Sequence, residues 1–311
     1  MTTSNAAAPC LSILIITYNR AADTLSLLEN IAEQEQVGDF LGEILLLNNH
    51  SSDDYTAVKD FVSRTALPIR YIDSDKNLGV SGGRNLLVKE AKFPYLVMLD
   101  DDLVFSEPDA VKTIGSLFDK EQYRKHNTGV ITFHIRYYDT LEIQQSAFPH
   151  KRFEAYKDKD WFLTYYFAGG AHVVKKELFD TIGNYPEDFF YGMEEYDFSM
   201  RALDAGYTLA YDSSVRVLHK ESPLGRVPTK EKLRMMWRNK CVVWYRYLPT
   251  KYFYGALVMW ALFYLKKSGY DFGGMLRYLR EHSRIPQSEH RKSISAKALA
   301  YLHQVKARLW Y

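Results

Sequence analysis

The sequence predicts an α/β fold whose central sheet is mixed, mostly parallel and flanked by helices. Short apolar runs rich in β-branched residues alternate with segments that read as helices, which is the pattern of a parallel sheet covered on both faces. Polar clusters follow these runs, where ligands gather at the carboxyl ends of strands. The last third reads as helices, so we also expect a helical C-terminal extension.

The elements follow one another in a regular order. Strands are expected at 11–17, 43–47, 69–72 and 95–99, and helices at 23–34, 57–64 and 84–92. The Gly-rich segment 79–83 reads as a turn. Further strands are expected at 128–135, 208–211 and 215–218, and a helix is expected at 195–205, where Gly206 would end it. Helices follow from about residue 229, and 287–295 reads as a solvated linker.

The charge is divided unevenly along the 311 residues. Residues 222–311 hold 18 Lys and Arg against 4 Asp and Glu, which leaves residues 1–221 with a net charge of −12 under a total of +2. We therefore expect a catalytic domain at 1–221 and a basic, aromatic-rich helical region at 222–311. Two cysteines in no paired motif and no signal peptide at the N-terminus predict a reducing, cytoplasmic location.

An acidic triplet, Asp100, Asp101 and Asp102, ends the fourth expected strand. Alternate side chains of an extended segment point the same way, so Asp100 and Asp102 can face one ligand while Asp101 points elsewhere. Two close carboxylates repel unless a cation lies between them, and Mg²⁺ or Mn²⁺ prefers such oxygen ligands. A helix N-terminus would also explain the triplet, because Asp is a common cap.

A second acidic group, Glu194, Glu195 and Asp197, opens the expected helix at 195–205. The helix dipole stabilises acidic side chains in a first turn, which is one explanation. A general base among carboxylates is the other, since aromatic neighbours would raise its pKa. His219, at the end of the run 215–218, is either structural or a metal ligand. The Gly-rich segment before Arg84 and Asn85 is either a turn or a phosphate-binding helix start.

In this order the motifs resemble those of glycosyltransferase family 2, over about two thirds of the chain. The segments that carry the resemblance are ILIITYNR (13–20), LLLNNHSSDD (45–54), NLGVSGGRN (77–85), MLDDD (98–102), FAGGAHVVKKELFDTIGNYPEDFFYGMEEYDFSMRALDAGY (167–207) and VLH (217–219). The resemblance implies the glycosyltransferase A fold, a nucleoside-diphosphate sugar as donor and inversion at the anomeric carbon. It also implies a divalent metal, Mn²⁺ or Mg²⁺.

The resemblance also assigns roles by position. Glu195 matches the catalytic base, with Asp197 and Arg201 supporting it. Asp100, Asp102 and His219 match the metal ligands. The residues that match the donor-binding positions are Thr17, Asn19, Asn48, Arg84, Asn85, Asp100 and Asp101. Asn48 departs from the pattern, because family members usually carry Asp there; the amide still accepts a hydrogen bond, but the nucleotide base is left open.

The expected partners are the nucleotide sugar and a glycan, glycolipid or lipid-linked acceptor, as in cell-surface polysaccharide synthesis. The apolar stretch 253–265 is too short to span a bilayer and has Lys on both sides. Three alternatives are therefore open: a peripheral membrane contact through 229–284 at the inner face of the cell membrane, a buried helix packed on the catalytic domain, and a homo-oligomer contact. No nucleic acid is expected, because the aromatic residues cluster instead of interleaving with the basic ones.

Two other functions remain alternatives. One is an inactive carbohydrate-binding or scaffold protein on the same fold, against which the intact Asp100, Asp102, Glu195 and His219 argue. The other is a nucleotidyltransferase, which should carry a Gly-rich loop after the first strand. The sequence from Tyr18 to Ala21 contains no glycine.

Overall fold

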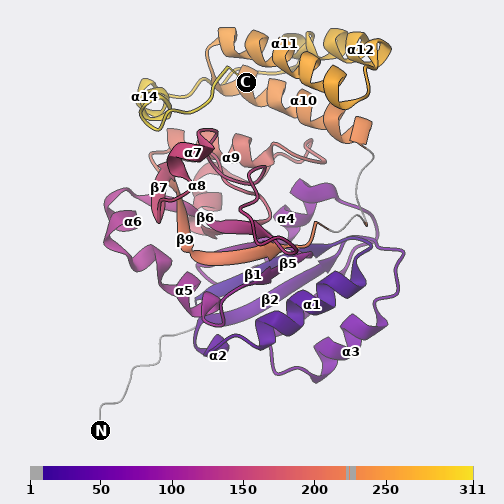
Figure 1. Ribbon diagram of the computed structural model, residues 1–311, viewed down its shortest axis with the longest axis vertical. Helices are drawn as coiled ribbons and strands as arrows, with labels where there is room; N and C mark the ends of the chain where they lie inside the picture. The colour runs from indigo at the N-terminus through magenta and orange to yellow at the C-terminus, as the bar shows by residue number, and fades with distance from the viewer. Residues whose placement is uncertain (1–9, 222–223, 225–228, 311) are drawn as a thin grey trace.

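The computed structural model describes residues 10–221, 224 and 229–310 (Figure 1). Within them a mixed sheet runs in the order β3-β2-β1-β4-β8-β6-β9-β5, and β7 pairs with β9. The first four of these strands are parallel neighbours, as the sequence predicts, and β8 then runs antiparallel to β4. The strands are β1 (Leu11–Thr17), β2 (Leu41–Asn48), β3 (Ile69–Asp73), β4 (Tyr95–Asp100), β5 (Leu103–Phe105), β6 (Thr128–Tyr137), β7 (Trp161–Thr164), β8 (Ala171–Lys175) and β9 (Thr208–His219).

Helices cover both faces of this sheet. Up to β9 they are α1 (Ala21–Ala32), α2 (Val37–Phe40), α3 (Thr56–Arg64), α4 (Gly79–Glu90), α5 (Ala110–Ser116), a 3₁₀ turn η1 (Leu117–Asp119), α6 (Glu121–Lys125), α7 (Phe153–Tyr156), α8 (Glu177–Ile182) and α9 (Glu194–Asp204). The C-terminal helices are α10 (Thr229–Tyr247), α11 (Thr250–Lys267), α12 (Phe272–His282), α13 (Ile285–Ser288) and α14 (Ala296–Gln304).

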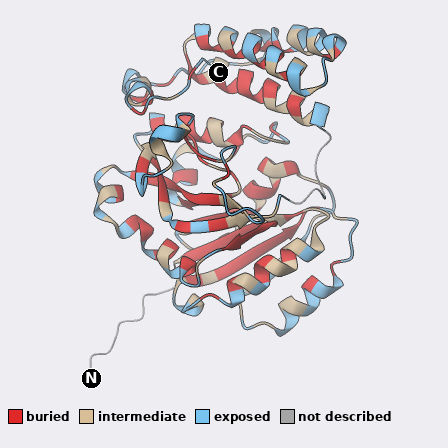
Figure 2. Cartoon of the chain, viewed as in Figure 1, coloured by how far each residue is buried: buried red, intermediate tan, exposed pale blue. Residues whose placement is uncertain are grey.

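The two faces of the sheet bury two separate hydrophobic clusters. Ile13 and Ile15 of β1 belong to the cluster under α1 and α5, whereas Leu14 between them belongs to the cluster under α4 and α9. This follows from the two-residue period of a strand, which sends successive side chains to opposite faces. A strand apolar at every position is therefore buried on both sides, as Figure 2 shows for the central strands.

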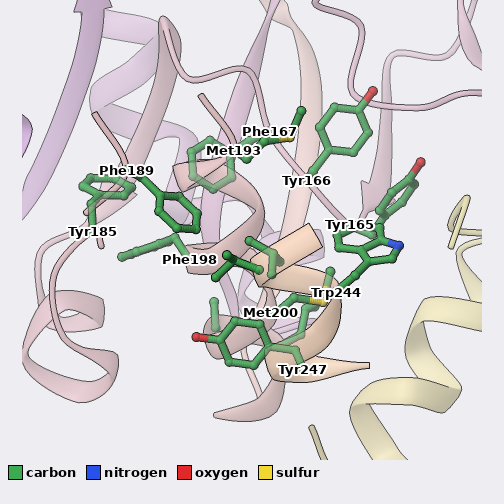
Figure 3. Close-up of a cluster of buried hydrophobic side chains, with 14 of the residues drawn as sticks. Tyr165, Tyr166, Phe167, Tyr185, Phe189, Met193, Phe198, Met200, Trp244 and Tyr247 are labelled. Carbon is green, nitrogen blue, oxygen red and sulfur yellow. The ribbon is translucent and has the colours of Figure 1, made fainter. Parts of the chain in front are cut away.

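The C-terminal helices form a separate layer that packs on α9 (Figure 1). Phe198 and Met200 of α9 share one hydrophobic cluster with Trp244 and Tyr247 of α10 (Figure 3). The helix bearing the second acidic group is therefore held from the C-terminal side of the chain. Among the described residues, every helix is too short or too polar to cross a bilayer.

Three local expectations were wrong. The segment 79–83 is not a turn but the first part of α4. Its glycines serve close packing, since a Cβ on Gly83 would lie 2.8 Å from Cδ1 of Ile16 in β1. The strands expected at 208–211 and 215–218 are one strand, β9. Part of the expected linker 287–295 belongs to α13.

Candidate active site

The acidic triplet at the end of β4 divides its three side chains between solvent and interior. The side chain of Asp100 is 49% exposed, whereas that of Asp102 is 2% exposed. Asp101 is buried as well. The turn after β4 thus differs from the extended segment that the sequence suggested, because the buried neighbours are Asp101 and Asp102 and not every second residue.

Arg20 compensates the two buried carboxylates. Its Nη1 lies 2.8 Å from Oδ1 of Asp101 and 3.1 Å from Oδ2 of Asp102. Burial still dominates at Asp101: it raises the pKa of that carboxyl to about 7, against the lowering effect of Arg20. Arg20 was not among the site residues predicted from the sequence, although it lies only three residues after the end of β1.

His219, the last residue of β9, lies beside Asp102. Its Nε2 is 3.2 Å from Oδ1 of Asp102, and its Nδ1 is 2.8 Å from Oε1 of Gln144. Because the amide oxygen of Gln144 is an acceptor, Nδ1–H donates a hydrogen bond to it, and Nε2 faces Asp102, to which it donates when the ring is protonated. Burial lowers the pKa of His219, but the hydrogen bond and charge of Asp102 outweigh it and the pKa is raised.

The distance between Oδ1 of Asp102 and Nε2 of His219 is compatible with both atoms binding one divalent cation. In an octahedral site with bonds of about 2.1 Å, neighbouring ligands lie about 3.0 Å apart, close to the 3.2 Å between Oδ1 of Asp102 and Nε2 of His219. In the part of the chain that the structure describes, no group of three His, Cys, Asp or Glu is arranged to hold a metal. The structure therefore brings together two of the three expected ligands, and Asp100 is not grouped with them.

The second acidic group opens α9, and one of its members is neutralised by Arg84. Nη1 of Arg84 lies 2.8 Å from Oε1 of Glu194, and both side chains are buried. Nη2 of Arg84 donates to the carbonyl of Gly169 and lies 3.7 Å from Oδ1 of Asp100. Arg84 thus links the triplet to the first turn of α9, a contact between residues 110 positions apart.

Glu195 is the least buried member of this group. It is partly buried and lines a cavity. Burial, followed by the nearby negative charge of Glu194, raises the pKa of Glu195 to about 8. A carboxyl whose pKa lies near neutrality suits proton transfer, because both protonation states are accessible.

Asp197 points away from that cavity. Its Oδ2 accepts two contacts from Arg201, at 2.8 Å from Nε and 2.7 Å from Nη2. Its Oδ1 accepts a hydrogen bond of 2.9 Å from the hydroxyl of Tyr247 in α10. Asp197 therefore joins α9 to the C-terminal helices, and Arg201 continues to the carbonyls of Ile182 to Asn184. This geometry fits a positioning role for both residues.

The polar residues at the ends of β1 and β2 hold each other in place. Thr17 is buried, and its Oγ1 lies 2.7 Å from that of Thr24 and 2.5 Å from the hydroxyl of Tyr55. Oδ1 of Asn19 accepts a hydrogen bond of 2.7 Å from the amide of Ser52. Asn48 donates to Asp73, at 2.9 Å. These side chains therefore fix the loops at this end of the sheet.

Asn85 also has backbone partners. Its Nδ2 donates to the carbonyl of Tyr185 at 2.9 Å, and its Oδ1 accepts from the amide of Tyr185 at 3.0 Å. This pair of bonds ties α4 to the loop before α9. Asn85 lines a groove of about 880 Å³ on the far side of α4, which the two acidic groups do not line.

Two cavities meet at the acidic groups. One of about 200 Å³ lies between the ends of β1 and β4 and the start of α4, with Arg20, Asn49 and Asp101 among its walls. The other, of about 380 Å³, is lined by Glu195 and His219. Both are lined by Arg84 and Asp100. The two cavities thus share a wall, and Glu195 lies on the side of the larger one.

Two adjacent glycines, Gly169 and Gly170, leave space for a carboxylate from each acidic group. A Cβ on Gly169 would lie 2.2 Å from Oε1 of Glu195, and a Cβ on Gly170 would lie 2.2 Å from Oδ2 of Asp100. Any larger residue would displace one carboxylate or the other. The sequence signal for this pair was visible as Ala168-Gly169-Gly170-Ala171, but its two contacts were not.

Solved structures of similar shape share this fold. The chain matches GalNAc-T7, solved with UDP, GalNAc and Mn²⁺, with a TM-score of 0.67 and 17% identity over 97% of this chain and 58% of that one. It matches the mannosyltransferase PcManGT from Pyrobaculum calidifontis, solved with GDP-Man and Mn²⁺, with a TM-score of 0.60 and 17% identity over 98% and 81%. The expected glycosyltransferase A fold is confirmed.

Sequence comparison gives the family. An alignment over 192 residues finds 27% identity with the Bacillus subtilis protein described as uncharacterized glycosyltransferase YwdF, over 62% of this chain and 67% of that protein. The family model described as glycosyl transferase family 2 matches residues 12–183, more than half of the chain. The chain therefore belongs to glycosyltransferase family 2.

Proposed function

We propose that this glycosyltransferase moves a sugar from a nucleoside diphosphate to a hydroxyl of a glycan, glycolipid or lipid-linked acceptor, with inversion and with a divalent metal. The observation that carries the proposal is the junction of the two cavities, where Asp100 and Arg84 line both and Glu195 lines only the larger. A donor in the smaller cavity would present its sugar to an acceptor in the larger one.

The chain's own groups supply the proton transfer. Glu195 takes the proton of the acceptor hydroxyl, and the hydroxyl oxygen attacks C1 of the sugar from the face opposite the diphosphate. The bond from C1 to the diphosphate oxygen breaks, so a single displacement inverts the configuration. Arg84 lies 2.8 Å from Glu194, and this ion pair stabilises the second buried carboxylate beside the base.

The metal would be held by Asp102 and His219, with Asp100 as the third expected ligand. When bound, Mn²⁺ or Mg²⁺ supplies positive charge to the departing diphosphate. Arg20 holds Asp101 and Asp102 in the arrangement that the site needs. Gln144 fixes the ring of His219 through Nδ1, as groups behind metal ligands commonly do.

The donor would lie along the ends of β1, β2 and β4. The smaller cavity is lined by Asn49, Arg84, Asp100 and Asp101. Thr17, Asn19 and Asn48 stand behind it as the residues that shape its loops, and Asn85 ties α4, which carries Arg84, to the loop before α9 through Tyr185. We place the enzyme in the cytoplasm, in cell-surface polysaccharide synthesis.

A panel of nucleotide sugars tests this function. The purified chain should hydrolyse one donor slowly without acceptor, and excess chelator should abolish the reaction until Mn²⁺ or Mg²⁺ is restored. Nuclear magnetic resonance of the first-formed sugar should show the inverted anomer. Full activity in chelator would remove the metal from the proposal, and a retained configuration would remove the single displacement.

A further inference from the structure

Large exposed hydrophobic residues gather on the C-terminal helical layer. Of 13 such residues in the described part of the chain, 7 lie between positions 254 and 276. They are Tyr254, Val258, Met259, Leu262, Tyr270, Phe272 and Leu276. Single exposed hydrophobic residues are ordinary, whereas a concentration in one layer indicates an interaction surface.

The exposed residues of α11 form one stripe. Tyr254, Val258 and Leu262 follow each other at four-residue spacing and are 57%, 55% and 55% exposed. The opposite side of the helix is buried in the cluster shared with α10, through Phe253, Leu257 and other residues. A helix apolar on both sides needs two partners, and α10 supplies only one of them.

The exposed residues of α12 continue the same arrangement. Tyr278 and His282 face inward, because their rings contact Tyr264 of α11 and Trp237 of α10. Phe272 and Leu276, which are 58% and 60% exposed, lie on the other side of this helix. Both helices therefore turn an apolar stripe away from α10, and Figure 2 shows exposed positions along the outer side of this layer.

Positive charge is concentrated in the same segment as the two stripes. Residues 250–284 contain 6 Lys and Arg and 2 acidic residues. The two acidic residues are already paired with α10, Asp271 with Lys230 at 3.1 Å and Glu281 with Arg234 at 3.6 Å. Among the described residues, no carboxylate pairs with any of the six cations of 250–284, which are Lys251, Lys266, Lys267, Arg277, Arg280 and Arg284.

We propose that the outer face of α11 and α12, defined by the stripes 254–262 and 272–276 with their flanking cations, docks on an anionic lipid bilayer. Apolar and aromatic side chains enter the headgroup boundary, while Lys and Arg meet lipid phosphates. A second copy of the chain fits less well, because a symmetric contact would bring the cationic rims of two identical faces together. The helices lie on the bilayer and do not cross it, in agreement with their composition.

Vesicle flotation tests this surface. The full chain should float with vesicles of phosphatidylglycerol and phosphatidylcholine at low salt, and it should float less with pure phosphatidylcholine or at high salt. The double substitution Val258→Asp with Leu262→Asp should reduce the bound fraction by about tenfold or more. The matched control is Leu141→Asp, because Leu141 is 54% exposed but lies after β6, far from this layer in sequence.

Two further measurements keep the result interpretable. Thermal melting of each variant checks the fold, and Lys266→Glu with Lys267→Glu tests the charge without touching the apolar stripe. Absence of binding to anionic vesicles at low salt would overturn the proposal. So would an equal loss of binding in Leu141→Asp, or light scattering that shows a wild-type dimer turned monomeric by the Val258 and Leu262 changes.

Discussion

The acidic triplet at the end of β4 and the acidic group that opens α9 both hold several carboxylates close together, but their charges are stabilised by different contacts. Each crowds carboxylates into a largely buried space, and a buried or partly buried arginine pairs with each, Arg20 with Asp101 of the triplet and Arg84 with Glu194 of α9. Asp100 and Asp101 of the triplet and Glu194 and Glu195 of α9 line the cavities. The two groups differ in the partners of Asp102 and Glu195.

In the triplet, Asp102 meets a histidine nitrogen at a distance that suits a shared cation. On α9, Glu195 lies beside another glutamate, and its pKa is raised to about 8. We propose that the first group holds a cation and that the second holds and releases a proton. Substitutions that keep the shape but change the charge should therefore affect two different observables.

The largest effect is expected at Glu195. Glu195→Gln keeps the size of the side chain but cannot accept a proton, so turnover should fall by about 10³-fold, within the usual range for a general base. Donor binding, measured by calorimetry with the nucleoside diphosphate, should change little. Glu177→Gln, an exposed acid in the first turn of α8, is the control; near-normal turnover in Glu195→Gln would assign the base elsewhere.

The next effect is expected at Asp102. Asp102→Asn should raise the Mn²⁺ concentration needed for activity by about 100-fold or more. Even the loss of a group that only orients a metal ligand lowers metal affinity by about 10- to 100-fold. A titration of activity with Mn²⁺ measures this change. The matched control is Asp119→Asn, another Asp paired with an arginine at 2.7 Å but on the surface. An unchanged Mn²⁺ requirement would remove Asp102 from the metal site.

Most of the sheet could be predicted from the sequence, because strand and helix periods are local properties. The strands from Leu11 to Asp100 lie within two residues of their expected ends. The start of α4 was missed, since glycine usually signals a turn. At Gly83 it signals a helix packed against Ile16, and only the tertiary contact reveals that.

The candidate site could be predicted in its residue types but not in its pairings. Arg20 contacts Asp101 across 81 positions and Gln144 contacts His219 across 75. No local pattern encodes these contacts. Asp197 shows the reverse case: its motif position suggested chemistry, but its oxygens are directed to Arg201 and Tyr247.

A smaller effect, visible mainly in pH dependence, is expected at Glu194. A base with a pKa of about 8 is about one tenth ionised at pH 7, so activity should rise with pH through about 8. Glu194→Gln removes the charge that helps raise this pKa, which moves the midpoint to lower pH. Activity at pH 7 should then increase, by no more than about tenfold. If the pH–activity profile of Glu194→Gln did not shift, the pH dependence would reflect the titration of a group other than Glu195.

The pH dependence of stability gives a second measurement of how the charge of Glu194 affects the pKa of Glu195. Because the pKa of Glu195 is higher in the folded protein than its ordinary value of 4.5, its contribution to stability is full below that value and is lost as the pH rises through about 8. Thermal melting between pH 5 and 9 should show a weaker decline in Glu194→Gln than in the wild type. Glu177→Gln should follow the wild-type curve.

The smallest effects are expected at the two glycines between the acidic groups, and they separate the groups most directly. Gly169→Ala crowds Oε1 of Glu195 and Gly170→Ala crowds Oδ2 of Asp100, each from 2.2 Å. Because a carboxylate is the movable end of a side chain, each change should cost only a few-fold, about 1 kcal/mol. Gly169→Ala should lower kcat, and Gly170→Ala should raise the KM for the donor.

Gly38→Ala is the control for this pair, because a Cβ on Gly38 meets nothing within 4 Å. If both glycine variants changed the same kinetic parameter, the two acidic groups would act as one unit. A split between kcat and KM would instead show that proton transfer and donor binding are separate, although only one peptide bond joins the residues that make room for them.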